Sequence, residues 1–361
     1  MSELKSYDPI HLSHMRHEGD EVADNVVRNL FEIGYNPMVE QEYNAYQFND
    51  QPIPTSFPSS LVAYFDHLKK QARGIPDDNL VAGQAFFAKY SQELLAILGL
   101  LSLPYCYAAA DGAQVLYKSK RIRQSPEKRL PETAAFVFDV SEANAFLNGG
   151  KGIVSAGKVR LMHAAIRYHI VKSGHWNASF GTPINQEDMA GTNLAFSLIS
   201  IRGLRKLGYQ VTFAEAWSFI DMWNSIGRFL GVHDTLLPSD TREAFNLEKA
   251  IANRNFRKSN EGVELTKALH DHMRISFSDN SPIDPAAITA YLVGDKVAPM
   301  LGLETSTILP RLMEGISGLN AIKSLLRNDG AQKLKQAKKL YETQISGKTL
   351  EPFRLLNNLT D

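Results

Sequence analysis

Residues 213–230, FAEAWSFIDMWNSIGRFL, place their apolar side chains at a spacing close to 3.6 residues, the period of an amphipathic α-helix. Thr212 precedes this stretch and Glu215 follows three residues later, which is the arrangement of a capping box at a helix start. Segments with the same spacing and helical length occur at about 59–72, 83–103, 132–147, 156–172, 186–207, 242–253, 263–273, 285–293, 306–325 and 330–342. Candidate strands are few and short, at 115–118 and 209–211. The pattern predicts an all-α fold.

The composition is that of an ordinary globular protein. Of the 361 residues, 44% are hydrophobic and 22% are charged, which excludes the disordered, collagen-like and disulfide-scaffold classes. Basic and acidic residues number 39 each, so no net charge attracts the chain to nucleic acid. The single cysteine, Cys106, permits no internal disulfide and is typical of a reducing compartment. We therefore expect a cytoplasmic protein with no nucleic-acid partner.

One stretch, residues 94–110 (LLAILGLLSLPYCYAAA), resembles a membrane span. It is uncharged but only 17 residues long, at the lower limit for spanning, and Pro104 interrupts it. The amphipathic pattern of residues 86–93 continues into it, so we expect a buried central helix that ends near Pro104. The polar N-terminal residues lack the apolar segment of a secretory signal. We expect no stable membrane insertion.

A proline-rich stretch at residues 49–58 (NDQPIPTSFP) marks the one convincing boundary in the chain. We predict an N-terminal helical extension and Pro-rich arm over residues 1–58. Residues 59–345 then form one large all-α domain, and residues 346–361 form a C-terminal tail.

The segment richest in functional side chains is GKVRLMHAAIRYH, residues 157–169. On a helix, Arg160, His163 and Arg167 project from one side, and the small side chains of the neighbouring alanines leave room beside them. An imidazole on a mostly apolar stripe, with a guanidinium one turn away on either side, suits a flat cofactor with an anionic edge. A haem fits this description, because imidazole ligates the iron and arginines pair with the propionates. The alternative, which spacing alone favours, is a core histidine beside two arginines that form structural ion pairs.

Two motifs carry a resemblance to a known family. RLMHAAIRYH, residues 160–169, together with TPINQEDMAGTNLAFS, residues 182–197, resembles the rubber-oxygenase (latex-clearing protein) and mpaB-type oxygenase family. The similarity covers roughly residues 80–240. It implies a globin-like helical core that encloses a b-type haem, with additional helices at both ends. It also implies an oxygenase, since the characterised members cleave the carbon–carbon double bonds of polyisoprene with dioxygen.

The resemblance assigns roles along the predicted helix at 156–172. His163 matches the proximal ligand of the haem iron, and Arg160 and Arg167 match arginines close to the haem. His169 lies about 120° from His163 around the same helix and faces away from the cofactor.

Thirty residues upstream, Arg129 and Thr133 match a further pair on the distal side of the haem. Before that threonine the rubber-cleaving enzymes have a lysine, whereas this chain has Glu132. The distal glutamate of those enzymes would fall at residues 107–114, which contain no glutamate. We expect Glu132 and Thr133 to be catalytic, with Glu132 acting as a base or hydrogen-bonding an oxygen intermediate. The alternative is that Glu132 is an ordinary acidic residue at a helix start after Pro131.

The segment 182–197 also has two interpretations. Thr192 is expected to line the cofactor pocket, together with Asn193 and Phe196. A helix start explains much of the motif as well, because Asn185 is a good N-cap and acidic residues follow it.

We therefore expect residues 59–345 to form a haem-binding oxygenase domain that uses haem b and O₂ on a small apolar substrate. The departures from the rubber-cleaving pattern favour a substrate other than rubber. The alternative is a non-catalytic haem protein that senses, stores or transfers haem or a gas. The sequence does not identify an electron donor. His11, His14 and His17, which recur every third residue, are expected to be solvated surface residues.

Overall fold

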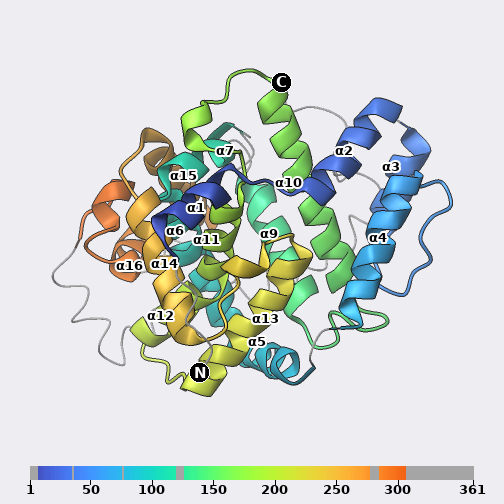
Figure 1. Ribbon diagram of the computed structural model, residues 1–361. Coiled ribbons are helices and arrows are strands. Elements are labelled where there is room, and N and C mark those ends of the chain that lie inside the picture. Colours follow the sequence, from blue (N-terminus) through green and yellow to red (C-terminus); the bar gives the residue numbers. More distant parts are fainter. Residues whose placement is uncertain (1–6, 35, 75–76, 119–125, 277–283, 306–361) are drawn as a thin grey trace.

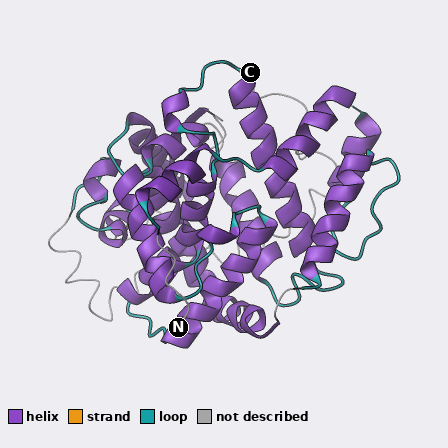
Figure 2. Ribbon diagram, viewed as in Figure 1, coloured by secondary structure: helices purple, strands orange, loops and turns teal. Residues whose placement is uncertain are grey.

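The computed structural model describes residues 7–34, 36–74, 77–118, 126–276 and 284–305. Within these ranges the regular secondary structure is helical, and the sole β-type pairing is an isolated bridge between Ala109 and Phe256 (Figures 1 and 2). The all-α prediction is confirmed. The predicted helices at 306–325 and 330–342 and the predicted tail lie outside the described residues.

The α-helices are α1 (Pro9–His17), α2 (Glu21–Ile33), α3 (Pro37–Ala45), α4 (Ser59–Ala72), α5 (Asp77–Ile97), α6 (Leu103–Tyr107), α7 (Ala110–Lys118), α9 (Pro126–Ser141), α10 (Gly152–Lys172), α11 (Gln186–Phe196), α12 (Leu198–Lys206), α13 (Phe213–Phe229), α14 (Thr241–Asn255), α15 (Asn260–Ser276) and α16 (Pro285–Val293). A π-helical turn, η1, covers Leu98–Ser102. Short 3₁₀ turns are η2 (Ala178–Phe180), η3 (Asp234–Leu236) and η4 (Ala298–Leu301).

The centre of the fold is the pair α5 and α13, which pack along each other. α13 begins as predicted, because Thr212 and Glu215 form a complete capping box. Gly83 on α5 permits the close approach, since a Cβ there would lie 2.5 Å from the Cβ of Met222 on α13. Burial of apolar residues across this contact supplies the main stabilising term.

The apolar stretch at residues 94–110 does not end at Pro104 as predicted. The chain passes through η1, in which the Leu103 N–H donates to the Leu98 carbonyl, and Pro104 then occupies the first turn of α6. Proline is tolerated there because first-turn N–H groups have no partner within the helix. By length and composition, residues 78–107 are the one span in the described chain that could cross a membrane, and half of its apolar window is buried inside the protein.

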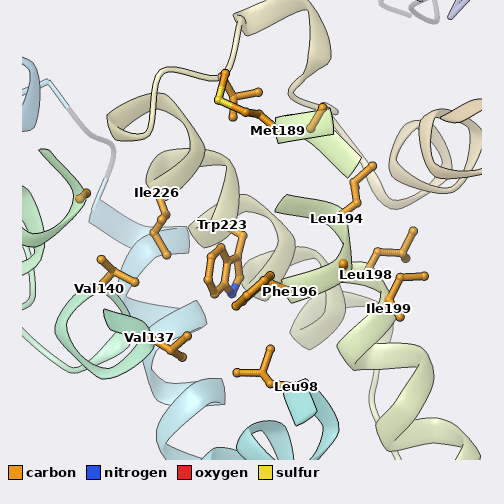
Figure 3. Packing of buried hydrophobic residues seen from close by; sticks show 14 of the residues in the cluster. Leu98, Val137, Val140, Met189, Leu194, Phe196, Leu198, Ile199, Trp223 and Ile226 are labelled. Atoms are coloured by element: carbon orange, nitrogen blue, oxygen red, sulfur yellow. The ribbon is translucent and has the colours of Figure 1, made fainter. Parts of the chain in front are cut away.

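A buried apolar layer joins the C-terminal part of α5 and η1 to α9, α11 and α13 (Figure 3). Phe196 of α11 packs against Trp223 of α13, with ring centroids 5.2 Å apart. Leu98, Val137 and Ile226 lie around this pair, each 7% exposed or less. These side chains form the apolar environment next to the helices that carry the candidate site.

Three local predictions are wrong. Residues 115–118 belong to α7, and residues 209–211 form no strand. The predicted helix at 186–207 is two helices, because the backbone of Ser197 leaves helical geometry (φ −106°, ψ −83°). The Ser197 hydroxyl donates to the Asn193 carbonyl at 2.9 Å, a local hydrogen bond typical of bends in helices.

Candidate functional site

α10 carries the central residue of the candidate site. This helix packs against α2, α4, α9 and α13, so its middle turns are enclosed by other helices. His163 lies in one of these turns, partly buried, and its Nδ1 is inaccessible to solvent. Ala164 and Ala165 beside it are buried, and their small side chains permit close packing.

Arg160, one turn before His163, forms a buried ion pair with Asp20. The Arg160 Nη2 donates to Asp20 Oδ1 at 2.8 Å, and its Nε donates to the other carboxylate oxygen, so the pair is bidentate. Burial lowers the pKa of Arg160, but the hydrogen bonds and charge of Asp20 outweigh this effect and the pKa is raised. Asp20 is also the N-cap of α2, accepting from the Ala23 N–H. The start of α2 is therefore fixed directly to α10.

Arg167, one turn after His163, pairs with Asp24 on α2. The Arg167 Nε lies 2.9 Å from Asp24 Oδ1, and Nη1 donates to the Ile184 carbonyl at 2.7 Å. Burial raises the pKa of Asp24, and Arg167 offsets that shift only in part. The remaining nitrogen, Nη2, is buried and makes no hydrogen bond within the described chain.

The two arginines thus have protein partners that the sequence motif did not indicate. Asp20 and Asp24 lie about 140 residues before Arg160 and Arg167, and no local pattern connects them. The structural ion pairs of the alternative interpretation are present. The predicted contacts with haem propionates stay a prediction, for which Arg167 Nη2 is the buried donor still available.

The predicted distal residues lie on α9, which packs against α10. α9 begins at Pro126 rather than near Glu132, so the expectation that Glu132 and Thr133 open a helix is wrong. Pro131 lies inside the helix, where it removes one backbone hydrogen bond and favours a bend. Glu132 and Thr133 are both partly buried and make contacts with neighbouring groups. Arg129 is within α9, but its side chain lies outside the described part of the structure.

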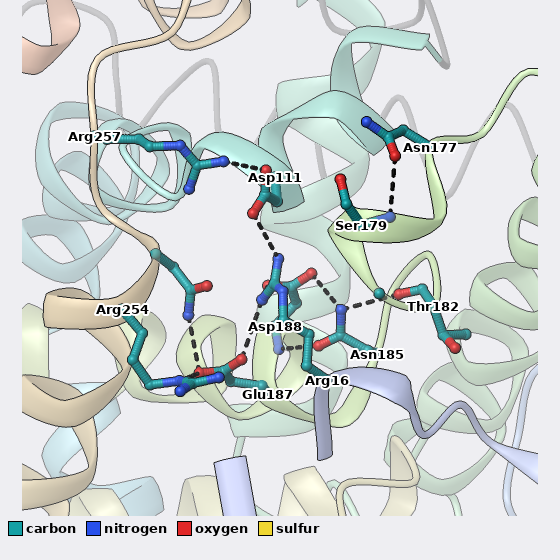
Figure 4. Close-up of polar contacts among 12 residues, drawn as sticks. Arg16, Asp111, Asn177, Ser179, Thr182, Asn185, Glu187, Asp188, Arg254 and Arg257 are labelled. Carbon is teal, nitrogen blue, oxygen red and sulfur yellow. Dashed lines mark hydrogen bonds and ion pairs between the residues drawn. The ribbon is translucent and has the colours of Figure 1, made fainter. Parts of the chain in front are cut away.

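The side chains at the start of α11, within the segment 182–197, form a network of hydrogen bonds and ion pairs (Figure 4). Asn185 caps α11 by accepting from the Asp188 N–H at 2.9 Å, as expected for a helix start. Glu187 is fully buried and accepts from Arg16 of α1 and Arg254 of α14. Burial raises the pKa of Asp188, which also faces Arg16. These carboxylates hold the N-terminal helix α1 against the body of the protein.

Thr192 is exposed, and its hydroxyl donates to the Asp188 carbonyl at 2.9 Å within α11. Its neighbour Asn193 is the inward-facing residue, since it is 5% exposed. Asn193 Oδ1 and the indole nitrogen of Trp223 are both buried without a hydrogen-bond partner in the described chain. No motif in the sequence indicates Trp223 as a site residue, although an indole N–H in a core usually finds an acceptor.

No group of three or more metal-binding side chains exists among the described residues. His11, His14 and His17 form no such group, and His11 instead contacts the Thr235 hydroxyl. A haem needs only one or two protein ligands, so this finding does not bear on it.

The residues around His163 fit a haem in two respects. The imidazole is partly buried on a helix enclosed by apolar neighbours, and Arg167 Nη2, one turn along the same helix, is a buried donor without an acceptor. A buried donor of this kind costs free energy unless an acceptor such as a carboxylate reaches it.

Comparison with known proteins gives three matches. The sequence model of the family described as "ER-bound oxygenase mpaB/B'/Rubber oxygenase, catalytic domain" matches residues 88–318. The rubber oxygenase of Streptomyces sp. (strain K30) is 26% identical over 322 residues, which cover 85% of this chain and 79% of that protein. A solved structure of latex clearing protein LCP in the closed state superimposes with a TM-score of 0.75 at 24% identity, over 94% of each chain. The last comparison shows a common fold.

Proposed function

The chain belongs to the mpaB and rubber oxygenase family, and we propose that it is a haem b-dependent oxygenase of a small apolar substrate. The homology supports an oxygenase-type activity in general. The observation that carries the finer proposal is the position of His163, partly buried in the enclosed middle of α10.

Each protein group has a role in this proposal. His163 holds the haem through its ring nitrogen, and Arg167 Nη2 donates a hydrogen bond to a propionate. Haem bound there would supply the activation of dioxygen. Asp20 and Asp24 fix α2 against α10 on either side of His163 and so keep the imidazole in place.

α9 supplies the groups on the other side of the proposed site. The Glu132 carboxylate accepts a proton from the substrate, and the Thr133 hydroxyl can donate to an oxygen atom. A carboxylate is a harder ligand than the lysine amine of the rubber-cleaving enzymes, so Glu132 would compete less with dioxygen for a ferrous iron. The substrate is apolar because aromatic and aliphatic side chains such as Val137, Phe196 and Trp223 dominate the neighbouring core.

The first test is the His163→Ala variant. We expect wild-type protein purified with its haem to show the absorption of a b-type haem at about one per chain, and the variant to lose most of it. His169→Ala is the matched control, because His169 is on the same helix but packs against Phe31 with ring centroids 4.9 Å apart. Full haem content in His163→Ala would refute the assignment of the ligand.

The second test is Glu132→Gln, which keeps the shape of the side chain and removes its ability to take a proton. Oxygen uptake by the reduced protein, measured with a panel of terpenoid, fatty and aromatic compounds, should fall by about 10²–10⁴-fold for the best substrate. Glu142→Gln, just beyond the end of α9, is the control and should retain activity. No oxygen uptake with any compound, in a protein that contains haem, would instead favour the non-catalytic haem protein.

A further inference from the structure

α12, α13 and α14 contact one another on one side of the molecule (Figure 1). α12 and α14 each bury one face, through residues such as Leu204 and Leu247, which are inaccessible to solvent. α12 contains no acidic residue, and the acidic side chains of α14, Glu243 and Glu248, are only 2% and 7% exposed. The outer surface of these helices and of the first turn of α13 is called the α12–α14 face. Its basic and aromatic side chains are Arg202, Arg205, Phe213, Arg242, Phe245 and Lys249.

Two phenylalanines extend from this face into solvent. Phe213 is 81% exposed and Phe245 is 47% exposed. An arginine of α12 lies over each ring, with the Arg205 Cζ 5.9 Å from the Phe213 centroid and the Arg202 Cζ 5.3 Å from the Phe245 centroid. The two arginines are three residues apart on α12 and are therefore neighbours on one helix face. The rings and guanidinium groups thus form one continuous surface.

The mobile charges on the α12–α14 face are positive. Arg242 and Lys249 lie one turn before and one turn after Phe245, on the exposed side of α14. Arg205 is also exposed, and it donates to a backbone carbonyl, which leaves its charge uncompensated. None of these three cations forms an ion pair within the described part of the chain. They are therefore available to an anionic partner.

Carboxylates near the face offset only part of its charge. Glu248 pairs with Arg202 from the buried side of α14. Burial lowers the pKa of Lys206 at the edge of the face, and the negative charge of Asp295 opposes this shift, so these two charges lie close together. Asp240 is exposed but precedes α14, where it serves as the N-cap. The middle of the face keeps its exposed cations and rings.

We propose that the α12–α14 face binds the surface of an anionic lipid membrane. Basic side chains attract anionic headgroups, and phenylalanine rings enter the boundary between the headgroups and the acyl chains. The contact is peripheral, since the face offers protruding side chains and no helix that would cross the bilayer. No residue of the proposed oxygenase site belongs to this face, so the two proposals stand or fall separately.

A second copy of the chain fits the face less well than a membrane does. In a symmetric dimer the same surface patch meets itself. Arg242 and Lys249 would then be brought close to their own copies, and like charges repel each other. An anionic bilayer has the opposite charge and an apolar interior for the rings, so it complements both features of the face.

The test is co-sedimentation of the full-length protein with vesicles of phosphatidylcholine containing about 30% phosphatidylserine. We expect saturable binding at low salt and at least about tenfold weaker binding to vesicles of phosphatidylcholine alone. Binding should also fall at least about tenfold in 0.5 M NaCl, because salt screens the attraction between exposed charges.

Two variants separate the contributions of charge and ring. Each Lys or Arg at a membrane surface strengthens binding about fivefold, so the double variant Arg242→Gln/Lys249→Gln should bind about 25-fold more weakly. Phe213→Ser should weaken binding about tenfold, because it removes a ring that enters the interface. The variant should fold, since Phe213 is largely exposed and the capping box of Thr212 and Glu215 is retained.

Each variant has a matched control away from the face. Lys70→Gln/Arg73→Gln removes two exposed cations at the C-terminal end of α4, across the molecule (Figure 1). Ile275→Ser removes an apolar side chain of α15 that is 85% exposed. Both should bind the anionic vesicles as the wild type does.

The proposal is overturned if the wild type does not bind the anionic vesicles, or if either variant binds them as well as its control. Sedimentation velocity supplies the remaining outcome. A wild-type dimer that Phe213→Ser dissociates, in a protein that does not bind vesicles, would show that the face joins two copies of the chain instead.

Discussion

Asp20→Asn is the substitution that tests most directly how α2 is fixed to α10. The amide keeps an oxygen that can cap α2 but loses the negative charge that balances Arg160. Both side chains of the pair are nearly inaccessible, at 4% for Asp20 and 9% for Arg160. Removing one partner of a buried ion pair costs about 3–5 kcal/mol, because the other charge stays buried without compensation. We expect a loss near the lower limit, about 3 kcal/mol, since the amide oxygen still accepts one hydrogen bond.

This loss converts into a measurable change in Tm. An unfolding entropy of about 2.1 cal/mol/K per residue gives about 0.76 kcal/mol/K for 361 residues. A loss of about 3 kcal/mol then lowers Tm by roughly 4 °C. Asp20→Ala also removes the N-cap, which adds about 1 kcal/mol. The assay is differential scanning calorimetry of the wild type and both variants in one buffer.

Asp234→Asn is the matched control for these measurements. Arg228 and Asp234 form an ion pair through the same atom types, but their side chains are 45% and 78% exposed. Exposed pairs contribute about 0–1 kcal/mol, so Tm should change by about 1 °C or less. If Asp20→Asn also changes Tm by no more than this, the pair does not hold α2 to α10 as described. Equal losses for Asp20→Asn and Asp20→Ala would refute the separate contribution of the cap.

Two further predictions concern stability elsewhere in the fold. His270 is 2% exposed, and burial, with a smaller effect of Arg274, lowers its pKa to about 4. In the unfolded chain the His270 imidazole takes up a proton near pH 6.5, whereas in the folded protein it stays neutral down to about pH 4. The contribution of neutral His270 to the free energy of unfolding is therefore complete above pH 6.5 and is lost as the pH falls to about 4. In urea titrations, the free energy of unfolding of the wild type should fall between pH 7 and pH 5 by about 2 kcal/mol more than that of His270→Gln. An equal fall in both proteins would contradict the lowered pKa of His270. Gly83→Ala should destabilise by about 1–3 kcal/mol or more, because its Cβ would meet Met222 at 2.5 Å. Gly74→Ala, where the nearest atom is 3.7 Å away, should stay within about 0.5 kcal/mol in the same urea assay, and similar values for both would exclude a tight α5–α13 contact.

The bounds of several helices were predictable from the 3.6-residue periodicity, both with a side-chain cap, as in α13 and α16, and without one, as in α4. α4 and α16 have the predicted bounds, and α13 starts at the capping box formed by Thr212 and Glu215. The predicted helix bounds were wrong at two prolines, which the sequence rule places at helix ends and the structure places within helical segments. Pro131 predicts a helix start but lies inside α9, because the helix tolerates the missing hydrogen bond. Pro104 predicts a helix end, but the chain continues through the π-helical turn η1 into α6.

The helix that carries the candidate site was predictable, but the partners of its arginines were not. The spacing of Arg160, His163 and Arg167 placed all three on α10, and the structure has them there. The carboxylates that balance the two arginines come from α2, and long-range pairs of this kind leave no periodic signal in one sequence. For the same reason, the buried contacts of Glu187 with Arg16 and Arg254 could not be inferred from a helix-start motif.

The ion pairs between α2 and α10 also bear on where an independently folding unit can begin. The family model starts at residue 88, whereas Asp20 and Asp24 lie far upstream of it. A fragment limited to residues 88–318 would retain Arg160 and Arg167, which are 7% and 4% exposed, without the carboxylates that neutralise them. The region that the family model matches therefore lacks the carboxylates that balance these two arginines, and we expect a fragment limited to it to be unstable.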